Sequence, residues 1–306
     1  MLLCPPSYTL RLVSEKASKT ASRFRLIALD VDGTLLNPQG HVSPRTARAI
    51  REAMARGVLV VVCTRRAFSS GVQQLARELG LSLPAIVRNG NAIQDTATGE
   101  VLMYRAIPAV AMQAALDTIL EGETAPVVEQ GPVHGEALFT LAERAGDPAL
   151  VQVTREWARA GHLRFVDAEA LYAIPEPTWI GAYGTGEATR RVYQVLRGIA
   201  GVSTYWTGEL IEREYHFTGV QPAESTKATA LQLFAAERGI ALSEVMAVGD
   251  YYNDVEMLRE VGWGVAMGHA PDYVKGFADA VVPDNAHDGA AVAIERYVLA
   301  GETNPA

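Results

Sequence analysis

The chain has 306 residues, 49% of them hydrophobic and 20% charged, and this composition excludes a disordered chain. Its length suits one large domain or two modest ones. The formal charge of −8, from 27 basic and 35 acidic residues, excludes the broad basic surface that binds nucleic acid or an anionic membrane. We therefore expect neither of those partners.

The first 22 residues carry basic side chains, but no apolar core of signal-peptide length and no small-residue cleavage pattern. We interpret them as a flexible extension. No apolar stretch reaches the length that spans a membrane, so we expect a cytoplasmic protein. Of the two cysteines, Cys4 and Cys63, the second ends an apolar run, which favours a buried thiol over a metal ligand or a disulfide.

The first elements alternate between apolar strands and capped helices. Residues 24–31 are nearly all apolar, which is typical of a strand buried on both faces of a parallel sheet. Ser43 and Pro44 then form a helix start, and Gly57 ends that helix. Three more elements are predicted: a strand at 58–63, a helix with Val72, Leu75 and Leu79 on one face that closes at Gly80, and a short strand at 85–87.

The C-terminal third repeats this alternation. The predicted elements are a helix at 226–238, a strand at 245–248, a helix opening near Asn253, a strand at 264–267, a helix at 271–278 and a strand at 280–282. Apolar strands that alternate with helices indicate an α/β fold with a doubly wound, mostly parallel sheet.

The middle of the chain has a different pattern. Mixed strand candidates occur at 127–128, 137–140, 163–166, 179–183 and 203–206, with amphipathic helices near 148–160 and 187–199. This pattern predicts an α+β domain at 108–208, inserted into a sheet domain made of 23–107 and 209–306. The chain crosses between them near Pro108 and near Thr207.

Two carboxylates, Asp30 and Asp32, follow the first strand and lead into Gly33. One of them could serve a metal and act as a nucleophile, while the other transfers protons. A polar turn and a Ca²⁺ loop are the alternatives. An EF-hand is excluded, because Leu35 stands in place of its glycine and His41 in place of its bidentate glutamate.

Two further clusters could bind a phosphoryl group. Thr64, followed by Arg65 and Arg66, comes just after the second strand, where open α/β sheets bind ligands. Lys227 stands at a helix start, where the helix dipole disfavours a cation. A bound anion would explain that position, and so would simple solvent exposure.

The fourth cluster is Gly249-Asp250-Tyr251-Tyr252-Asn253-Asp254, directly after a strand. Asn253 can cap the next helix. With the first pair, four carboxylates converge on one sheet edge and would repel one another unless a cation neutralises them. Hard oxygen ligands and phosphate chemistry favour Mg²⁺.

These clusters resemble the motif set of the haloacid dehalogenase superfamily. In chain order they are D-x-D-G-T, a Thr at a strand end, a Lys, and G-D-x-x-N-D. Three further segments resemble the Cof-type sugar phosphatases of this superfamily, which carry a large α/β cap. They are 88–93 (R-N-G-N-A-I), 264–270 (G-V-A-M-G-H-A) and the pair Asp288-Gly289. The resemblance covers about 24–298 and implies a phosphatase for a small phosphorylated metabolite, expected to be a sugar phosphate.

The resemblance also implies roles for individual residues. Asp30 would attack phosphorus and form an aspartyl-phosphate, and Asp32 would act as general acid and then as general base. Phosphate would be held by Thr64, Lys227 and Gly33. Metal ligands would be Asp30, Asp250 and the backbone carbonyl of Asp32, with Asn253 and Asp254 in support or against substrate. Substrate contacts are expected for Arg65, Arg66 and Asn89.

Two residues depart from the family pattern. Arg65 replaces the usual glycine of T-G-R, and would either bind a further anionic group or point to solvent. His269 replaces the usual asparagine of G-N-A, which we interpret as loop variation rather than a new base. In the insert, His134, Arg164, Trp179 and Tyr183 could face the site or could equally be packing residues.

Other functional classes explain fewer of these sequence features than a phosphatase does. A signalling receiver is shorter and has neither a second Asp two residues after the first nor an insert. A catalytically silent binding protein rests only on Arg65, and a phosphomutase or phosphotransferase stays open until products are analysed. For assembly, we expect a monomer or a weak homodimer.

Overall fold

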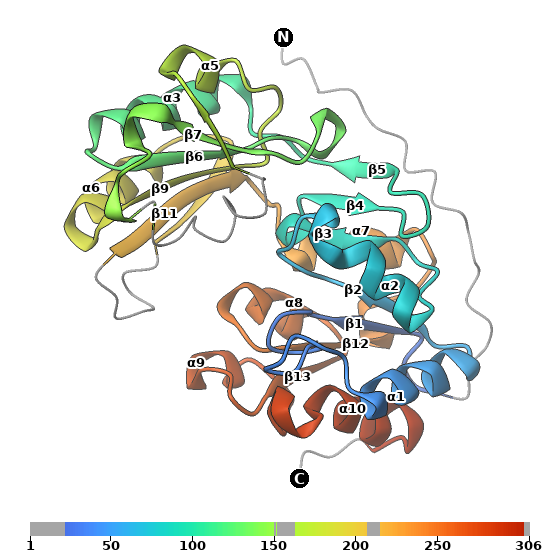
Figure 1. The fold of residues 1–306 in the computed structure, drawn as a ribbon. Coiled ribbons are helices and arrows are strands. Elements are labelled where there is room, and N and C mark those ends of the chain that lie inside the picture. Colours follow the sequence, from blue (N-terminus) through green and yellow to red (C-terminus); the bar gives the residue numbers. More distant parts are fainter. Residues whose placement is uncertain (1–21, 150, 152–162, 207–214, 303–306) are drawn as a thin grey trace. The chain divides into compact units, whose positions relative to one another are not determined.

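The computed structural model describes residues 22–149, 151, 163–206 and 215–302 (Figure 1). The chain divides into two compact units: unit 1 contains the described residues up to Met103 and from Thr226, and unit 2 spans Tyr104–Ser225. The expected extension, apart from Ser22, lies outside the described residues. So do most of the helix predicted at 148–160 and the expected return crossing at 207–208.

Unit 1 is built on a five-stranded parallel sheet with the order β14-β13-β12-β1-β2. Its strands are β1 (Leu26–Leu29), β2 (Leu59–Val62), β12 (Val245–Gly249), β13 (Trp263–Met267) and β14 (Ala280–Val282). β1 lies between β2 and β12, and all four of its residues are fully buried. The near-continuous apolar run therefore forms the central strand, as its sequence predicts.

Helices cover both faces of this sheet (Figure 1). They are α1 (Pro44–Ala55), α2 (Gln73–Leu79), α7 (Lys227–Ala236), α8 (Val255–Glu260), α9 (Asp272–Lys275) and α10 (Gly289–Ala293). Leu26 and Ala28 pack in one cluster with Leu231 of α7 and Met257 of α8. Because side chains alternate along a strand, the neighbouring residues of β1 face the opposite layer, which contains α1 and α10. The doubly wound α/β fold is confirmed.

The predicted helix boundaries agree with the observed ones where the chain carries cap residues. Ser43 accepts a hydrogen bond from the amide of Thr46, and Pro44 opens α1. Gly80 closes α2 in the left-handed conformation, with φ of 70°. These side chains and this glycine satisfy the polar groups that a helix end leaves unpaired, so their positions in the sequence locate the ends.

The short strand at 85–87 belongs mainly to a second sheet. β3 (Ala85–Val87) pairs antiparallel with β4 (Ala92–Gln94), and β5 (Val101–Tyr104) completes the three strands. A single parallel bridge joins Ile86 to Cys63, at the end of β2. Cys63 is fully buried and free, as predicted, and burial is the main reason that the pKa of its thiol lies above the ordinary value.

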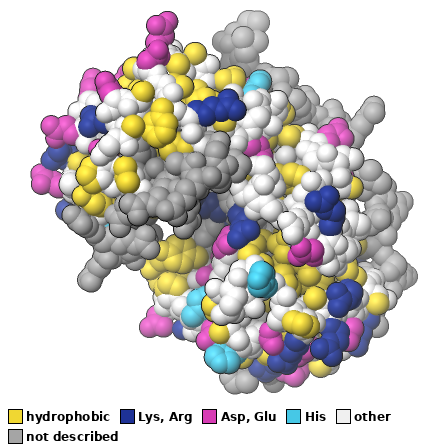
Figure 2. Space-filling model, in the orientation of Figure 1, with side chains coloured by type: hydrophobic (Ala, Val, Ile, Leu, Met, Phe, Trp, Pro, Cys, Tyr) yellow, Lys and Arg dark blue, Asp and Glu magenta, His cyan; other side chains and the backbone are white. Residues whose placement is uncertain are grey.

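Charged side chains of both signs are interspersed over the visible face of the molecule (Figure 2). Within the described residues, no helix is both long enough and apolar enough to cross a membrane.

Unit 2 is an α+β unit. Its six-stranded sheet has the order β10-β11-β9-β6-β7-β8. The strands are β6 (Ala125–Glu129), β7 (Leu138–Leu141), β8 (Leu163–Val166), β9 (Trp179–Thr185), β10 (Val202–Trp206) and β11 (Tyr215–Pro222), and the helices are α3 (Ala109–Glu121), α5 (Ala168–Tyr172) and α6 (Gly186–Leu196).

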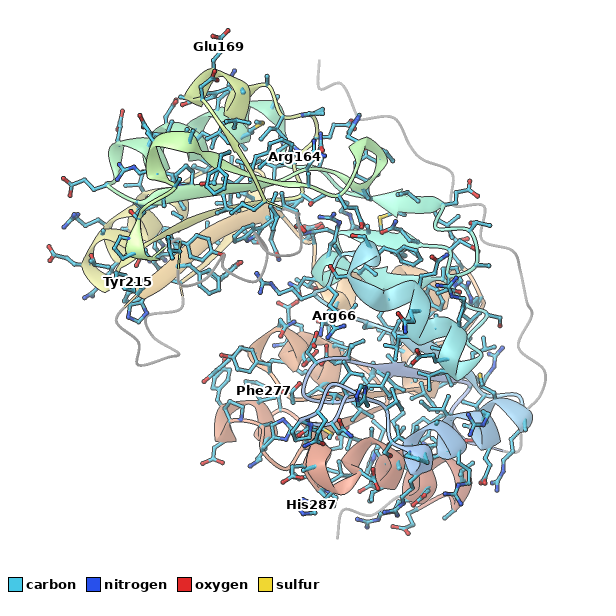
Figure 3. All side chains as sticks on the ribbon, in the orientation of Figure 1. Arg66, Arg164, Glu169, Tyr215, Phe277 and His287 are labelled. Atoms are coloured by element: carbon cyan, nitrogen blue, oxygen red, sulfur yellow. The ribbon has the colours of Figure 1, made fainter. Side chains whose placement is uncertain are left out.

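Two elements of unit 2 differ from the expectations. β11, which opens at Tyr215 (labelled in Figure 3), pairs antiparallel with β9 and β10. The structure therefore places in unit 2 a segment that the sequence analysis assigned to the sheet domain. α3 was not predicted, because its sequence, A-V-A-M-Q-A-A-L-D-T-I-L-E, is apolar on most sides and lacks a polar cap residue.

Candidate active site

Three neighbouring strands of unit 1 deliver the predicted residues to one edge of the sheet. Asp30 follows β1, Asp250 follows β12, and Thr64 comes two residues after β2. Because these strands are parallel and adjacent, their carboxyl ends meet at the same edge. This is the edge at which open α/β sheets place ligands.

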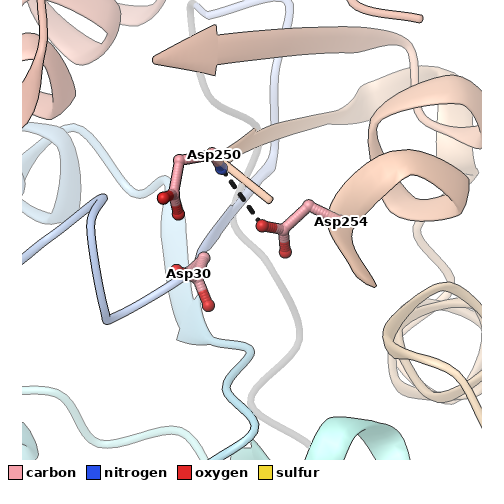
Figure 4. A group of neighbouring side chains, drawn as sticks. All are labelled: Asp30, Asp250 and Asp254. Atoms are coloured by element: carbon pink, nitrogen blue, oxygen red, sulfur yellow. Dashed lines mark hydrogen bonds between the residues drawn. The ribbon is translucent and has the colours of Figure 1, made fainter. Parts of the chain in front are cut away.

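Three buried carboxylates meet there: Asp30, Asp250 and Asp254 each offer one oxygen, and these oxygens lie within 4.8 Å of one another (Figure 4). Asp254 also accepts hydrogen bonds from the backbone amides of Asp250, at 3.1 Å, and Tyr251, at 3.0 Å. It therefore folds the loop after β12 back on itself and holds Asp250 next to Asp30.

Lys227 supplies the positive charge of this cluster. Its Nζ donates to Oδ1 of Asp30 at 2.5 Å and to Oδ1 of Asp254 at 2.7 Å, and the residue is fully buried. Thr226 caps α7 in front of it. Burial alone would lower the pKa of Lys227, but the charges and hydrogen bonds of both aspartates raise it above the ordinary value. Solvent exposure, the simple explanation of a cation at this helix start, is therefore wrong.

The cluster carries excess negative charge, since three carboxylates and one ammonium leave two negative charges. Burial is the largest cause that raises the pKa of Asp30, and the charge of Asp254 adds to it while Lys227 opposes it. Burial and Asp254 likewise raise the pKa of Asp250. A buried set of oxygen donors short of two positive charges fits a hard divalent cation such as Mg²⁺.

The loop after β1 fits closely against Asp250. A Cβ atom on Gly33 would lie 2.3 Å from Oδ2 of Asp250, and the φ of +82° at Gly33 also favours glycine. Thr34 then donates from its hydroxyl to Oδ1 of Asp250 at 3.1 Å. Gly33 was among the predicted site residues and Thr34 was not, although the motif D-x-D-G-T contains both.

Asp32 stands apart from the three buried carboxylates. Its side chain is 57% exposed and forms an ion pair with Arg66 (labelled in Figure 3). Of the four carboxylates that were expected to converge, the structure brings three together. The fourth lies at the surface of the site, paired with Arg66 and open to solvent.

A second loop ties the strand-end threonine to the segment after β12. Thr64 is buried, its hydroxyl accepts from the amide of Arg66, and its carbonyl accepts from the amide of Asn89. Asn253 donates from Nδ2 to Oδ1 of Asn89 at 3.0 Å. The expectation that Asn253 could cap the next helix is therefore wrong. Asp254 stands at the N-cap position of α8, and its side chain makes no capping hydrogen bond to that helix.

The two departures from the family pattern lie in different surroundings. Arg65 is exposed. His269 places Nε2 at 3.3 Å from Oδ2 of Asp250, so it borders the carboxylate cluster.

The four cap candidates all contact neighbours inside unit 2. His134 pairs with Glu176 at 2.8 Å, and the guanidinium of Arg164 lies 5.6 Å from the ring of Phe139. Trp179 donates from Nε1 to the hydroxyl of Tyr205 at 2.6 Å, and Tyr183 stacks on Phe217. Trp179 and Tyr183 are buried, which favours their interpretation as packing residues.

Comparisons with known proteins agree with this geometry. The model of the family of haloacid dehalogenase-like hydrolases matches residues 27–131 and 202–294. Phosphatase YwpJ of Bacillus subtilis is 30% identical, over 88% of this chain and 98% of its own. From the same organism, the 5-amino-6-(5-phospho-D-ribitylamino)uracil phosphatase YcsE is 29% identical, over 90% and 96%.

A solved structure is also similar. The phosphatase BT1666 of the haloalkanoate superfamily, from Bacteroides thetaiotaomicron, has a TM-score of 0.75 and 27% identity, and the match covers 93% of this chain and 99% of that one.

Proposed function

The chain belongs to the haloacid dehalogenase-like hydrolases and is a phosphatase, and we propose that it uses Mg²⁺ and a phosphoryl-enzyme on Asp30 to hydrolyse a small phosphorylated metabolite, with a sugar phosphate as the expected class. The observation that carries the proposal is the buried cluster of Asp30, Asp250 and Asp254 around Lys227. A cluster of this charge is suited to holding a divalent cation next to a phosphoryl group.

In the first half of the proposed reaction, a carboxylate oxygen of Asp30 attacks phosphorus while the bond to the leaving oxygen breaks. Asp32 gives its proton to that oxygen. In the second half, Asp32 takes a proton from water, the water oxygen attacks phosphorus, and inorganic phosphate leaves a regenerated Asp30. The position of Asp32, at the exposed side of the site, supports this division of roles.

Other side chains would bind and orient the phosphoryl group. Thr64 follows β2, the strand next to the one that carries Asp30, and the ammonium of Lys227 at the start of α7 contacts Asp30 directly. Gly33 allows the loop of Asp32 to approach Asp250. Bound Mg²⁺, held by Asp30 and Asp250, would supply positive charge for the developing charge on the phosphoryl oxygens. Asp254 accepts bonds from Lys227 and two amides, so we assign it to the support of this arrangement.

The relatives support a small-molecule substrate. YcsE is named for 5-amino-6-(5-phospho-D-ribitylamino)uracil, a phosphorylated sugar alcohol joined to a ring. We extend to this chain only the shared chemistry, which is a primary phosphate ester on a small polyhydroxy group.

Trapping of the phosphoryl-enzyme tests the proposal. Wild-type protein is mixed with Mg²⁺ and a substrate found by screening phosphorylated metabolites for phosphate release, quenched in acid and digested. Mass spectrometry should find one added phosphoryl group on the peptide that contains Asp30, and none in the Asp30→Asn variant. An active enzyme with no phosphoryl group on that peptide at any quench time would overturn the covalent step.

A further inference from the structure

Four aromatic side chains form a continuous row in unit 1, and we call Tyr251, Tyr252, Tyr273 and Phe277 the aromatic ledge. The ring centroids of Tyr251 and Tyr252 are 5.0 Å apart, at 85° between planes. Those of Tyr252 and Tyr273 are 5.8 Å apart, and those of Tyr273 and Phe277 are 5.1 Å apart. Each ring thus lies within the distance range of favourable aromatic pairs.

The ledge combines two packed rings with two exposed ones. Tyr252 packs against the hydrophobic core of unit 1, and so does Phe277, which is labelled in Figure 3. Tyr251 is 41% exposed and Tyr273 is 60% exposed. A single exposed apolar side chain needs no explanation. Two exposed rings that contact two partly buried, core-packed neighbours form instead a preorganised surface for another flat group.

Two residues of the ledge, Tyr251 and Tyr273, lie close in sequence to residues of the carboxylate cluster or its border. Tyr251 directly follows Asp250, and its amide donates to Asp254 at 3.0 Å. Tyr273 stands on α9, four residues after His269, whose ring contacts Asp250 at 3.3 Å. Figure 2 shows hydrophobic side chains gathered over the part of unit 1 where Figure 1 places α8 and α9. The ledge therefore begins at the residue next to Asp250, beside the proposed phosphate site.

We propose that the aromatic ledge binds a planar heteroaromatic ring in the leaving group of the substrate, which narrows the substrate class to sugar or polyol phosphates that carry such a ring. This inference rests on the proposed function, because the phosphate must occupy the carboxylate cluster. A flat ring can pack on the faces and edges of Tyr251 and Tyr273. A bare sugar would bury hydroxyls against these rings, and a buried hydroxyl needs a hydrogen-bond partner.

Matched substrates test the ledge. Ribose 5-phosphate and uridine 5′-monophosphate share the ribose 5-phosphate group, and only the second carries a ring. Wild-type protein should have the higher kcat/KM for uridine 5′-monophosphate. Tyr251→Ala and Tyr273→Ala should each lower that kcat/KM by about three- to tenfold, the range expected for one aromatic pair. Both variants should change kcat/KM for ribose 5-phosphate by less than about twofold. Phe165→Ala, which removes a 45% exposed ring from unit 2, is the matched control and should change neither.

Calorimetry measures the binding of both esters to the Asp30→Asn variant and needs no turnover. It therefore tests the ledge separately from the proposed catalytic function. Tighter binding of uridine 5′-monophosphate than of ribose 5-phosphate, lost in Tyr273→Ala, supports the ledge even if neither ester is hydrolysed. Equal affinities, or equal kcat/KM losses on both esters, overturn it. It is also overturned if Tyr273→Ala converts a dimer to a monomer in size-exclusion chromatography while the kcat/KM of both esters stays unchanged, because the ledge would then join two copies of the chain.

Discussion

Arg66 binds the carboxylate of Asp32 through two hydrogen bonds, from Nε to Oδ2 at 2.8 Å and from Nη2 to Oδ1 at 2.6 Å. A guanidinium in this planar arrangement fixes the orientation of a carboxylate more strictly than a single contact does. The amide of Arg66 also donates to the hydroxyl of Thr64, so the backbone of Arg66 is attached to the site. Arg66 therefore ties the carboxylate of the proposed proton donor to the loop that contains Thr64.

If Arg66 acts by orienting Asp32, Arg66→Ala should lower kcat/KM for a sugar phosphate by about tenfold in the wild-type background, a fraction of the 10²–10⁴-fold that general acid–base catalysis contributes. It should have no further effect in the Asp32→Ala background, because its target is gone. The melting temperature should stay nearly unchanged, since an exposed ion pair contributes about 0–1 kcal/mol. An equal loss in both backgrounds would show instead that Arg66 contacts the substrate directly.

Lys227 should be necessary for folding as well as for catalysis. Lys227→Met leaves Asp30 and Asp254 buried without their cation, and we expect the free energy of unfolding to fall by about 3–5 kcal/mol. Adding Asp254→Asn should recover part of this loss, because one uncompensated charge disappears. Urea unfolding in chelator measures both, with Lys275→Met, on the surface helix α9, as the control. A Lys227→Met protein as stable as wild type would contradict the charge assignment.

Activity should vanish in chelator and return with Mg²⁺, because the carboxylate cluster lacks two positive charges without a cation. Ca²⁺ should not restore it, since its larger and less regular coordination shell misplaces the attacking carboxylate. Phosphate release measured in chelator, and then with each metal added in excess, checks this. Full activity in chelator would refute the metal assignment.

In the metal-free protein, the contribution of Asp250 to stability should fall as the pH rises through the carboxyl range. The pKa of Asp250 in the folded state is raised by burial and by Asp254. Between its unfolded and folded pKa values the folded state therefore holds more protons, so its contribution to stability is present at low pH and is lost as the pH rises through the folded pKa.

Melting curves in chelator, recorded across this range for wild type and Asp250→Asn, isolate that contribution. The melting temperature of Asp250→Asn should rise relative to that of the wild type as the pH rises. Adding Mg²⁺ should reduce this difference in melting temperature. A difference independent of pH would contradict the raised pKa.

Much of the fold was predictable, because apolar runs and cap residues act locally. The run at 24–31 and the Ser43-Pro44 start required no knowledge of the rest of the chain. Parallel topology then brought Asp30 and Asp250 to one edge, as expected from the rule for open sheets. The boundary of unit 2 was harder to predict from the sequence, because β11 is defined by its antiparallel pairing with β9 and β10 and not by its own residue pattern.

The same distinction holds inside the site. Residue types were sufficient to select Asp30, Asp32 and Lys227, but side-chain partners depend on distances across loops. Nothing in the spacing indicated that Asn253 would bond to Asn89, 164 positions away, rather than cap its own helix. The aromatic ledge also joins two separate segments, and no periodic pattern in the sequence connects them.

Leaving-group chemistry separates the roles of Asp32 and Asp30. A sugar alkoxide is a poor leaving group and needs a proton as the P–O bond breaks, whereas nitrophenolate departs without one. Asp32→Ala should therefore lower kcat/KM far more for a sugar phosphate than for p-nitrophenyl phosphate, by a margin of about 10²–10⁴-fold.

The ratio kcat/KM is the appropriate quantity, because it reports only the steps up to the first irreversible one, before water attacks the phosphoryl-enzyme. Mg²⁺ affinity, measured by calorimetry, should be unchanged, since the exposed side chain of Asp32 lies apart from Asp30, Asp250 and Asp254. Equal losses on both substrates with unchanged Mg²⁺ affinity would show that Asp32 is not the general acid. Lost affinity for Mg²⁺ would assign its side chain to the metal instead.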